Sequence, residues 1–284
     1  MSVSTDAAKA AIVCFLAVHS AASAVAETEV SLAADTTHGQ YGYDTATNTT
    51  ALTASAAWRF DRLMFYAEIP YIWVDGPAAA SSSPFLGNAA GSRHFSGSGP
   101  RGFRWADTVP ETPPRDGLGD AVVGAALRLT PDQTASRLSI IAGATLPTGD
   151  ETRGLGTGSS DVSLGIAGEY DIGRATLFSN AGFVFAENAD GGSRNWKALA
   201  AEVRDDFAFA SIGASYLFAD DQSAALFVSW NAASYEFEED TFLAGLSTSW
   251  PLTDAILFEM SGAAGIAGDG PDYSLGAQLT YAVH

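Results

Sequence analysis

The stretch "SDVSLGIAGEYDIGRATLFSNAGFVFA", residues 160–186, decides the fold. Apolar residues alternate with small or polar ones on both sides of the short turn "DIGR", which predicts two paired β-strands. The predicted strands, 160–171 and 174–186, are much longer than the about five or six residues usual in soluble proteins. A tilted strand that crosses a bilayer needs about nine to eleven residues. The length of this hairpin therefore favours a membrane barrel over a soluble sandwich.

The same alternation recurs along the chain, whereas helical periodicity is hard to find. It predicts about twelve strands, at residues 28–35, 49–60, 62–73, 119–129, 137–146, 160–171, 174–186, 206–218, 223–234, 240–250, 255–266 and 272–283. Most of these segments are as long as the strands of the opening hairpin.

The connections between these strands alternate in length along the chain. The long or medium ones are 36–48, 74–118, 147–159, 187–205, 235–239 and 267–271, and the short ones are Asp61, "TPDQTAS", "DIGR", "ADDQ" and "PLTD". Outer-membrane barrels have short periplasmic turns and longer extracellular loops, whereas a sandwich has no reason to sort its loops in this way. We therefore expect an all-β chain that forms a single antiparallel up-and-down transmembrane β-barrel of about 12 strands.

The two faces of the predicted strands differ in chemistry. One face is apolar and aromatic, and we expect it to meet lipid, while the other is small or polar and would line the lumen. Charged residues on the second face are candidates for solute selectivity: Arg59, Glu68, Arg128, Glu169 and Glu259. Aromatic residues near strand ends suit interfacial girdles or reflect ordinary strand propensity: Trp58, Tyr71, Trp73, Tyr170, Trp250, Tyr273 and Tyr281.

The connection 74–118 interrupts the strand pattern and is rich in Pro, Gly and Ser. It is too long for an inert turn in a compact domain, so it is either an external loop or a segment that folds into the lumen. Its basic and aromatic residues are candidates for a constriction: Arg93, Arg101, Arg104 and Trp105.

The N-terminal segment indicates where the protein is located, and the overall charge limits the kinds of partner it can bind. Residues 1–26 combine a short apolar run with a small-residue ending, which predicts a secretory signal peptide followed by a barrel at 27–284. The one cysteine, Cys14, lies inside that segment, so the expected mature chain has no disulfide. A formal net charge of −19 argues against nucleic acid as a partner, since phosphate binding needs a basic face.

The loop "LPTGDETRGLGTGSS", residues 146–160, resembles a phosphate or metal loop only superficially. No lysine follows its glycines, and it leads into a strand, so neither a Walker loop nor a dinucleotide fingerprint fits. Its acidic residues match no EF-hand spacing. The three histidines after residue 26, His38, His94 and His284, form no recognisable catalytic pattern. We therefore expect no catalytic residues, no resident metal and no cofactor.

The same loop and the hairpin after it resemble the phenol meta-degradation family of outer-membrane β-barrel proteins. The resemblance covers roughly residues 60–284 and includes "IPYIW" and "GLGDAVVGAAL". The residues that carry the family motif are Leu146, Pro147, Thr148, Gly149, Asp150, Gly156, Thr157, Gly158 and Asp161. The resemblance implies a barrel in the bacterial outer membrane that admits small hydrophobic or aromatic compounds.

The function that we expect is passive passage of a small solute through the barrel, without catalysis. The alternative is a closed structural or adhesive outer-membrane barrel that transports nothing. The expected partners are outer-membrane lipid and lipopolysaccharide, the barrel assembly machinery and a small solute, and the identity of that solute stays open.

Overall fold

The computed structural model describes residues 27–41, 45–77, 114–131, 134–186, 206–219, 221–233 and 239–283. The predicted signal peptide lies outside these residues, as do all four constriction candidates, Arg93, Arg101, Arg104 and Trp105. Those assignments remain predictions. Within the described ranges, no helix is long and apolar enough to cross a membrane.

The described chain is built almost wholly from antiparallel strands. Their bounds are β1 Glu27–Gly39, β2 Thr47–Phe60, β3 Leu63–Asp75, β4 Arg115–Leu118, β5 Ala121–Arg128, β6 Ser136–Leu146, β7 Val162–Ile172, β8 Ala175–Phe185, β9 Phe207–Ala219, β10 Gln222–Asn231, β11 Thr241–Pro251, β12 Ile256–Ala267 and β13 Tyr273–Val283. A single turn of 3-10 helix, η3 Glu151–Arg153, interrupts the loop after β6. The predicted strands thus agree with the observed ones to within a few residues at most ends.

The sheet closes on itself, because β1 pairs with both β2 and β13, and β2 also pairs with β3. The strands β4 and β5 both pair with β3, at Tyr71–Val74 and at Leu63–Glu68, so they are two halves of one wall strand. The amide of Gly119 still donates to the carbonyl of Pro70 at 2.9 Å across the break between them. The closed antiparallel barrel therefore has 12 wall strands, as the sequence predicts.

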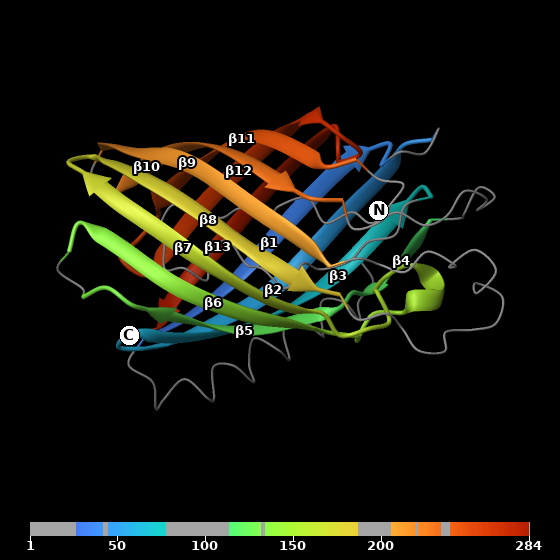
Figure 1. Cartoon of the computed structure of the whole chain (residues 1–284), viewed down its shortest axis with the longest axis horizontal. Coiled ribbons are helices and arrows are strands. Elements are labelled where there is room, and N and C mark those ends of the chain that lie inside the picture. Colours follow the sequence, from blue (N-terminus) through green and yellow to red (C-terminus); the bar gives the residue numbers. More distant parts are fainter. Residues whose placement is uncertain are drawn as a thin grey trace.

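The connections are sorted between the two ends of the barrel (Figure 1). The turns after β2, β7, β9 and β11 lie at the same end as the C-terminus, on the left of the view. The helical turn η3 and the ends of β1 and β3 lie at the opposite end. We call these the short-turn end and the loop end, and by the rule for outer-membrane barrels they face the periplasm and the exterior.

The outer surface of the barrel is apolar. Leucine, isoleucine and valine side chains at alternate positions are exposed, from 37% at Val123 to 66% at Ile212 and 69% at Leu226. An exposed apolar surface of this extent is unfavourable in water and favourable in lipid. The predicted aromatic residues lie on this outer face near strand ends, among them Tyr170 and Tyr273, which are 52% and 46% exposed. The outer face is therefore the lipid-facing one.

Candidate functional site: the barrel interior

One part of the inner wall, which we call the polar wall, carries small hydroxyl and amide side chains. Residues that pair across strands point to the same face, so the register identifies the inward set on β10–β13 and β1. That set includes Ser31, Ser223, Ser247, Ser249, Glu259, Ser261, Gln278 and Thr280. Hydroxyls there bond to one another, as between Ser223 and Ser249, whose Oγ atoms are 2.8 Å apart. This part of the lumen matches the predicted small and polar lining.

The other part of the inner wall is apolar, which the predicted alternation of faces does not describe. Met64, Tyr66, Val122, Ala126, Ile141 and Ala167 form one buried cluster on β3, β5, β6 and β7. The strand β3 is apolar on both faces: Phe65 is 43% exposed outside, while its neighbours Met64 and Tyr66 are almost fully buried inside. The predicted lining of small and polar side chains does not describe this part of the inner face, which carries larger apolar side chains. We call this cluster the apolar wall.

Inward aromatic rings lie flat against the wall over glycines. Each ring faces the glycine that is its register partner on the next strand: Tyr66 with Gly124, Phe178 with Gly213, Phe209 with Gly182 and Phe227 with Gly245. A Cβ on Gly213 would come within 2.3 Å of Cζ of Phe178, so only glycine leaves room for the ring. The pairing keeps large rings beside the wall instead of across the lumen.

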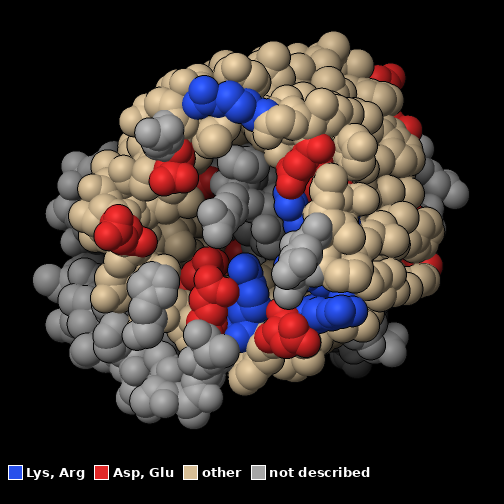
Figure 2. Space-filling model, turned by 90° about the vertical axis from the view of Figure 1, so that its left-hand side faces the viewer, with Lys and Arg blue, Asp and Glu red and all other residues tan. Residues whose placement is uncertain are grey.

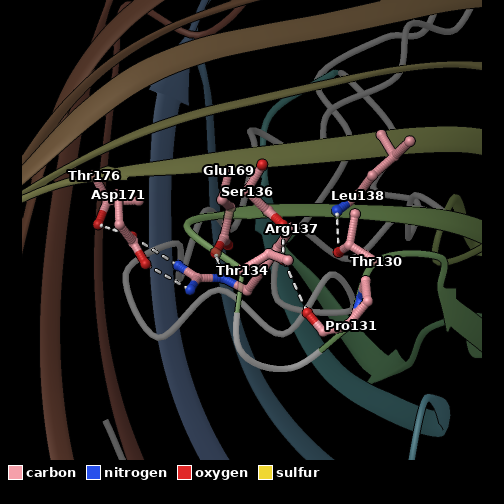
Figure 3. A network of polar contacts seen from close by, with 9 residues as sticks. All are labelled: Thr130, Pro131, Thr134, Ser136, Arg137, Leu138, Glu169, Asp171 and Thr176. Carbon is pink, nitrogen blue, oxygen red and sulfur yellow. Dashed lines mark hydrogen bonds and ion pairs between the residues drawn. The ribbon is translucent and has the colours of Figure 1, made fainter.

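Charged side chains at the short-turn end form a network on the inner face (Figure 3). Arg137 on β6 lies between two carboxylates of β7, with Nε 2.6 Å from Glu169 and Nη1 2.7 Å from Asp171. The hydroxyl of Thr176 on β8 donates to Asp171 at 2.7 Å. Glu169 is only 7% exposed, and a buried charge of this kind needs a partner such as Arg137. The network ties three neighbouring strands together.

Charges of both signs surround a hollow when the barrel is viewed from the short-turn end (Figure 2). Two of the predicted lumen arginines lie at this end. Nη1 of Arg59 is 3.4 Å from the carboxylate of Glu27, and Nη2 of Arg128 is 3.4 Å from the carbonyl oxygen of Asp61. The predicted charged residues are therefore not one cluster but are spread around the inner face.

The remaining predicted lumen residues are inward and buried. Glu68 on β3 is 5% exposed beside the apolar wall, and its register partner on β2 is Ser55. Glu259 on β12 is 6% exposed in the polar wall, between its register partners Ser249 and Gln278. All five residues thus face the interior, and their role in selectivity remains a prediction.

The family motif forms a loop whose hydrogen bonds bridge the break between β4 and β5. The hydroxyl of Thr148 donates to the carbonyl of Gly119 at 2.8 Å and accepts from the amide of Ala121 at 2.8 Å. Asp120, which has no exposed surface, accepts from the amides of Gly149 at 2.9 Å and Thr157 at 2.7 Å. A Cβ on Gly156 would meet the Asp120 carboxylate at 2.3 Å, which explains a glycine there. Four motif residues, Thr148, Gly149, Gly156 and Thr157, therefore hold this loop in place.

The tip of this loop reaches the inner wall. Asp150 caps η3, since its Oδ1 accepts from the hydroxyl and the amide of Thr152 at 2.6 and 3.0 Å. The Thr152 hydroxyl bond is the main reason that the pKa of Asp150 lies below its ordinary value. Leu155 follows the capping residue Gly154 and is buried with Ala51, Ile72 and Val74. The loop thus places one apolar side chain at the loop end of the lumen.

Sequence reasoning missed four of the residues that organise the interior: Asp120, Leu155, Arg137 and Asp171. Asp171 lies two residues after Glu169, so period-two alternation was a sufficient signal for its inward position. Arg137 could not be found in the same way, because its partners depend on the register between β6 and β7. The roles of Asp120 and Leu155 depend on the folded loop.

The histidines and acidic residues were the candidates for a catalytic or metal site. No group of three or more His, Cys, Asp or Glu side chains in the described part of the chain could hold a metal ion. His38 lies on β1 near the loop end, where its ring stacks on Tyr273 with centroids 5.2 Å apart and its Nδ1 is 2.8 Å from Oδ1 of Asn48. The other two histidines considered, His94 and His284, lie outside the described residues.

Comparisons with known proteins agree with this architecture. A family model described as "Putative MetA-pathway of phenol degradation" matches residues 22–283. The COG4313 outer membrane channel from Pseudomonas putida F1 has a TM-score of 0.67 at 15% identity, covering 91% of this chain and 96% of that one. The KdgM porin in complex with disordered oligogalacturonate has a TM-score of 0.51 at 8% identity, covering 90% and 99%. No curated protein matches the sequence. The fold is that of bacterial outer-membrane channels, and the apolar outer face places the barrel in that membrane.

Proposed function

The chain belongs to the phenol meta-degradation family, whose model spans residues 22–283, and from that premise we propose that it gives small solutes passive passage across the bacterial outer membrane. Barrels of about eight strands are filled by side chains, whereas those of about 16 leave an open aqueous channel. A barrel of 12 strands lies between these limits and suits a narrow path.

The observation that carries the proposal is the lining of the barrel. The polar wall offers hydroxyl groups to a solute, and the apolar wall offers a surface to a hydrophobic or aromatic one. The inward rings that lie over glycines add aromatic surface to the inner wall. These features support small hydrophobic and aromatic compounds as the solute class.

The proposal includes no chemical reaction. Catalysis by acid–base or nucleophilic groups needs a positioned pair within hydrogen-bond reach. The ionised groups described at the short-turn end are engaged in structural pairs, as Arg137 is with Glu169 and Asp171. This arrangement favours a conduit over an enzyme.

Selectivity and partners form the remaining parts of the proposal. The five inward charges would bias passage, as lumen charges do in other barrels. Arg93, Arg101, Arg104 and Trp105 of the connection 74–118 would add a constriction. The apolar outer face suits lipid and lipopolysaccharide, and insertion would require the barrel assembly machinery. The proposed selectivity rests on the inward position of the charged residues, and the proposed partners rest on the location in the membrane.

Liposome swelling tests the proposed passage. Liposomes that contain the folded protein should swell in isosmotic arabinose and in phenyl glucoside, and more slowly in the larger sugar raffinose. Phenyl glucoside carries an aromatic ring on a sugar that lipid alone excludes, so it reports on the apolar wall. Swelling equal to that of liposomes with boiled protein would favour the second function, a closed structural barrel.

A further inference from the structure

Glu259 is a buried carboxylate that lies near a second inward carboxylate, Glu29 of β1. It lies on β12 in the polar wall, and it is 6% exposed. Its register partners are Ser249 on β11 and Gln278 on β13, so it is flanked by a hydroxyl and an amide on the inner face. A buried carboxylate at this place is costly unless a cation or hydrogen-bond donors compensate its charge.

The two register partners of Glu259 form their hydrogen bonds with other residues. The Ser249 hydroxyl is 2.8 Å from that of Ser223, and Nε2 of Gln278 donates to the Thr280 hydroxyl at 3.0 Å. By contrast, the equally buried Glu169 has Arg137 at 2.6 Å, and Glu27 has Arg59 at 3.4 Å. Among the residues that the structure describes, none forms a hydrogen bond or an ion pair with Glu259. Its carboxylate is therefore available to a ligand in the lumen.

The opposite side of the barrel has complementary chemistry. In the circular strand order, β6 lies halfway around from β12. Ile141 of β6, which is 1% exposed, sits in the apolar wall with Met64 and Val122. A solute between the two walls would meet an apolar surface on one side and, on the other, the buried carboxylate of Glu259 with Glu29 near it.

We propose that Glu259 binds the ammonium group of an amphiphilic amine, whose hydrocarbon or aromatic part contacts the apolar wall. The inference rests on the proposed function, since it names a solute class for the same lumen. An ammonium group suits the site because it brings the positive charge and the donors that the polar wall does not direct at Glu259.

Binding of benzylammonium to the folded barrel in detergent tests this proposal, with benzyl alcohol as the neutral ligand of the same shape. Equilibrium dialysis should show that the native protein binds benzylammonium more tightly than benzyl alcohol. Glu259→Gln should weaken benzylammonium binding about tenfold or more, because a charge-assisted hydrogen bond is lost, and should leave benzyl alcohol binding unchanged. Glu259→Asp, which keeps the charge, should retain most of the preference.

The matched control is Asp254→Asn, which removes one negative charge from the exposed turn between β11 and β12. It should bind both ligands as the native protein does. Heat-modifiable migration on a gel verifies that each variant forms the barrel. The proposal is overturned if the native protein shows no preference for benzylammonium, if Glu259→Gln retains it, or if Asp254→Asn loses as much.

This experiment measures binding and not passage, so the proposed ammonium site and the proposed passage of solutes can be refuted independently. A barrel that conducts but does not prefer benzylammonium removes only the ligand assignment. A barrel that prefers benzylammonium through Glu259 but gives no swelling keeps the site and removes the passage.

Discussion

Asp120 organises the loop end of the barrel from a fully buried position. The amides of Gly149 and Thr157 donate to its carboxylate instead of to a neighbouring strand. Hydrogen bonds to a charged group of this kind contribute about 1.5–3 kcal/mol each to stability. Two further motif residues have a physical explanation here: Thr148 bridges the broken strand, and Gly156 makes room for the carboxylate.

Asp120→Ala should therefore release the loop of residues 147–161 while the barrel stays closed. Arg153 is already exposed in η3, so trypsin cleavage after it should accelerate by at least about tenfold once the loop opens. Mass spectrometry of the digest measures the rate. Asp75→Ala, an exposed aspartate at the loop end of β3, is the matched control and should cleave at the native rate. Equal rates for the two variants would refute the anchoring role.

The strands are the part of the molecule that the sequence predicts best. The hairpin predicted at 160–171 and 174–186 is observed at Val162–Ile172 and Ala175–Phe185, because a two-residue period survives wherever one face meets lipid and the other faces inward. The alternation was less informative for β3, whose two faces are both apolar. The break after β4 could not be predicted, since it depends on contacts with a loop that begins 29 residues later in the chain.

The aromatic–glycine pairs show why the site was harder to predict than the strands. Any glycine in a strand could mark a bulge or a close approach, and the sequence does not say which ring lies opposite which glycine. Only the register of β8 with β9 brings Phe178 to Gly213. The same reason kept Arg137 and its two carboxylates from being recognised as one network.

Gly213→Ala should displace the ring of Phe178 from the wall, because the new Cβ would be 2.3 Å from Cζ. Such overpacking costs about 1–3 kcal/mol, so the urea midpoint of the folded barrel should fall. Adding Phe178→Leu should restore most of the loss. Gly168→Ala serves as the control, since the nearest atom to its Cβ would be 3.8 Å away. A Gly213→Ala barrel as stable as the control would contradict the close packing.

At the scale of the whole molecule, the alternation of long and short connections along the sequence predicts an up-and-down barrel. Barrel closure through β1 and β13 confirms the prediction of 12 strands with both described ends of the chain on the short-turn side. The interior combines one polar and one apolar wall, which a description of strand faces one at a time does not reveal. That combination is the physical basis for a conduit that accepts solutes with hydrophobic parts.

The most direct test of the conduit is the conductance of the folded, heat-modifiable protein in a planar lipid bilayer. We predict discrete current steps when the native barrel is added, and none when the same protein is boiled first. A folded barrel that inserts into the bilayer and carries no current would contradict the account and would identify a closed structural barrel.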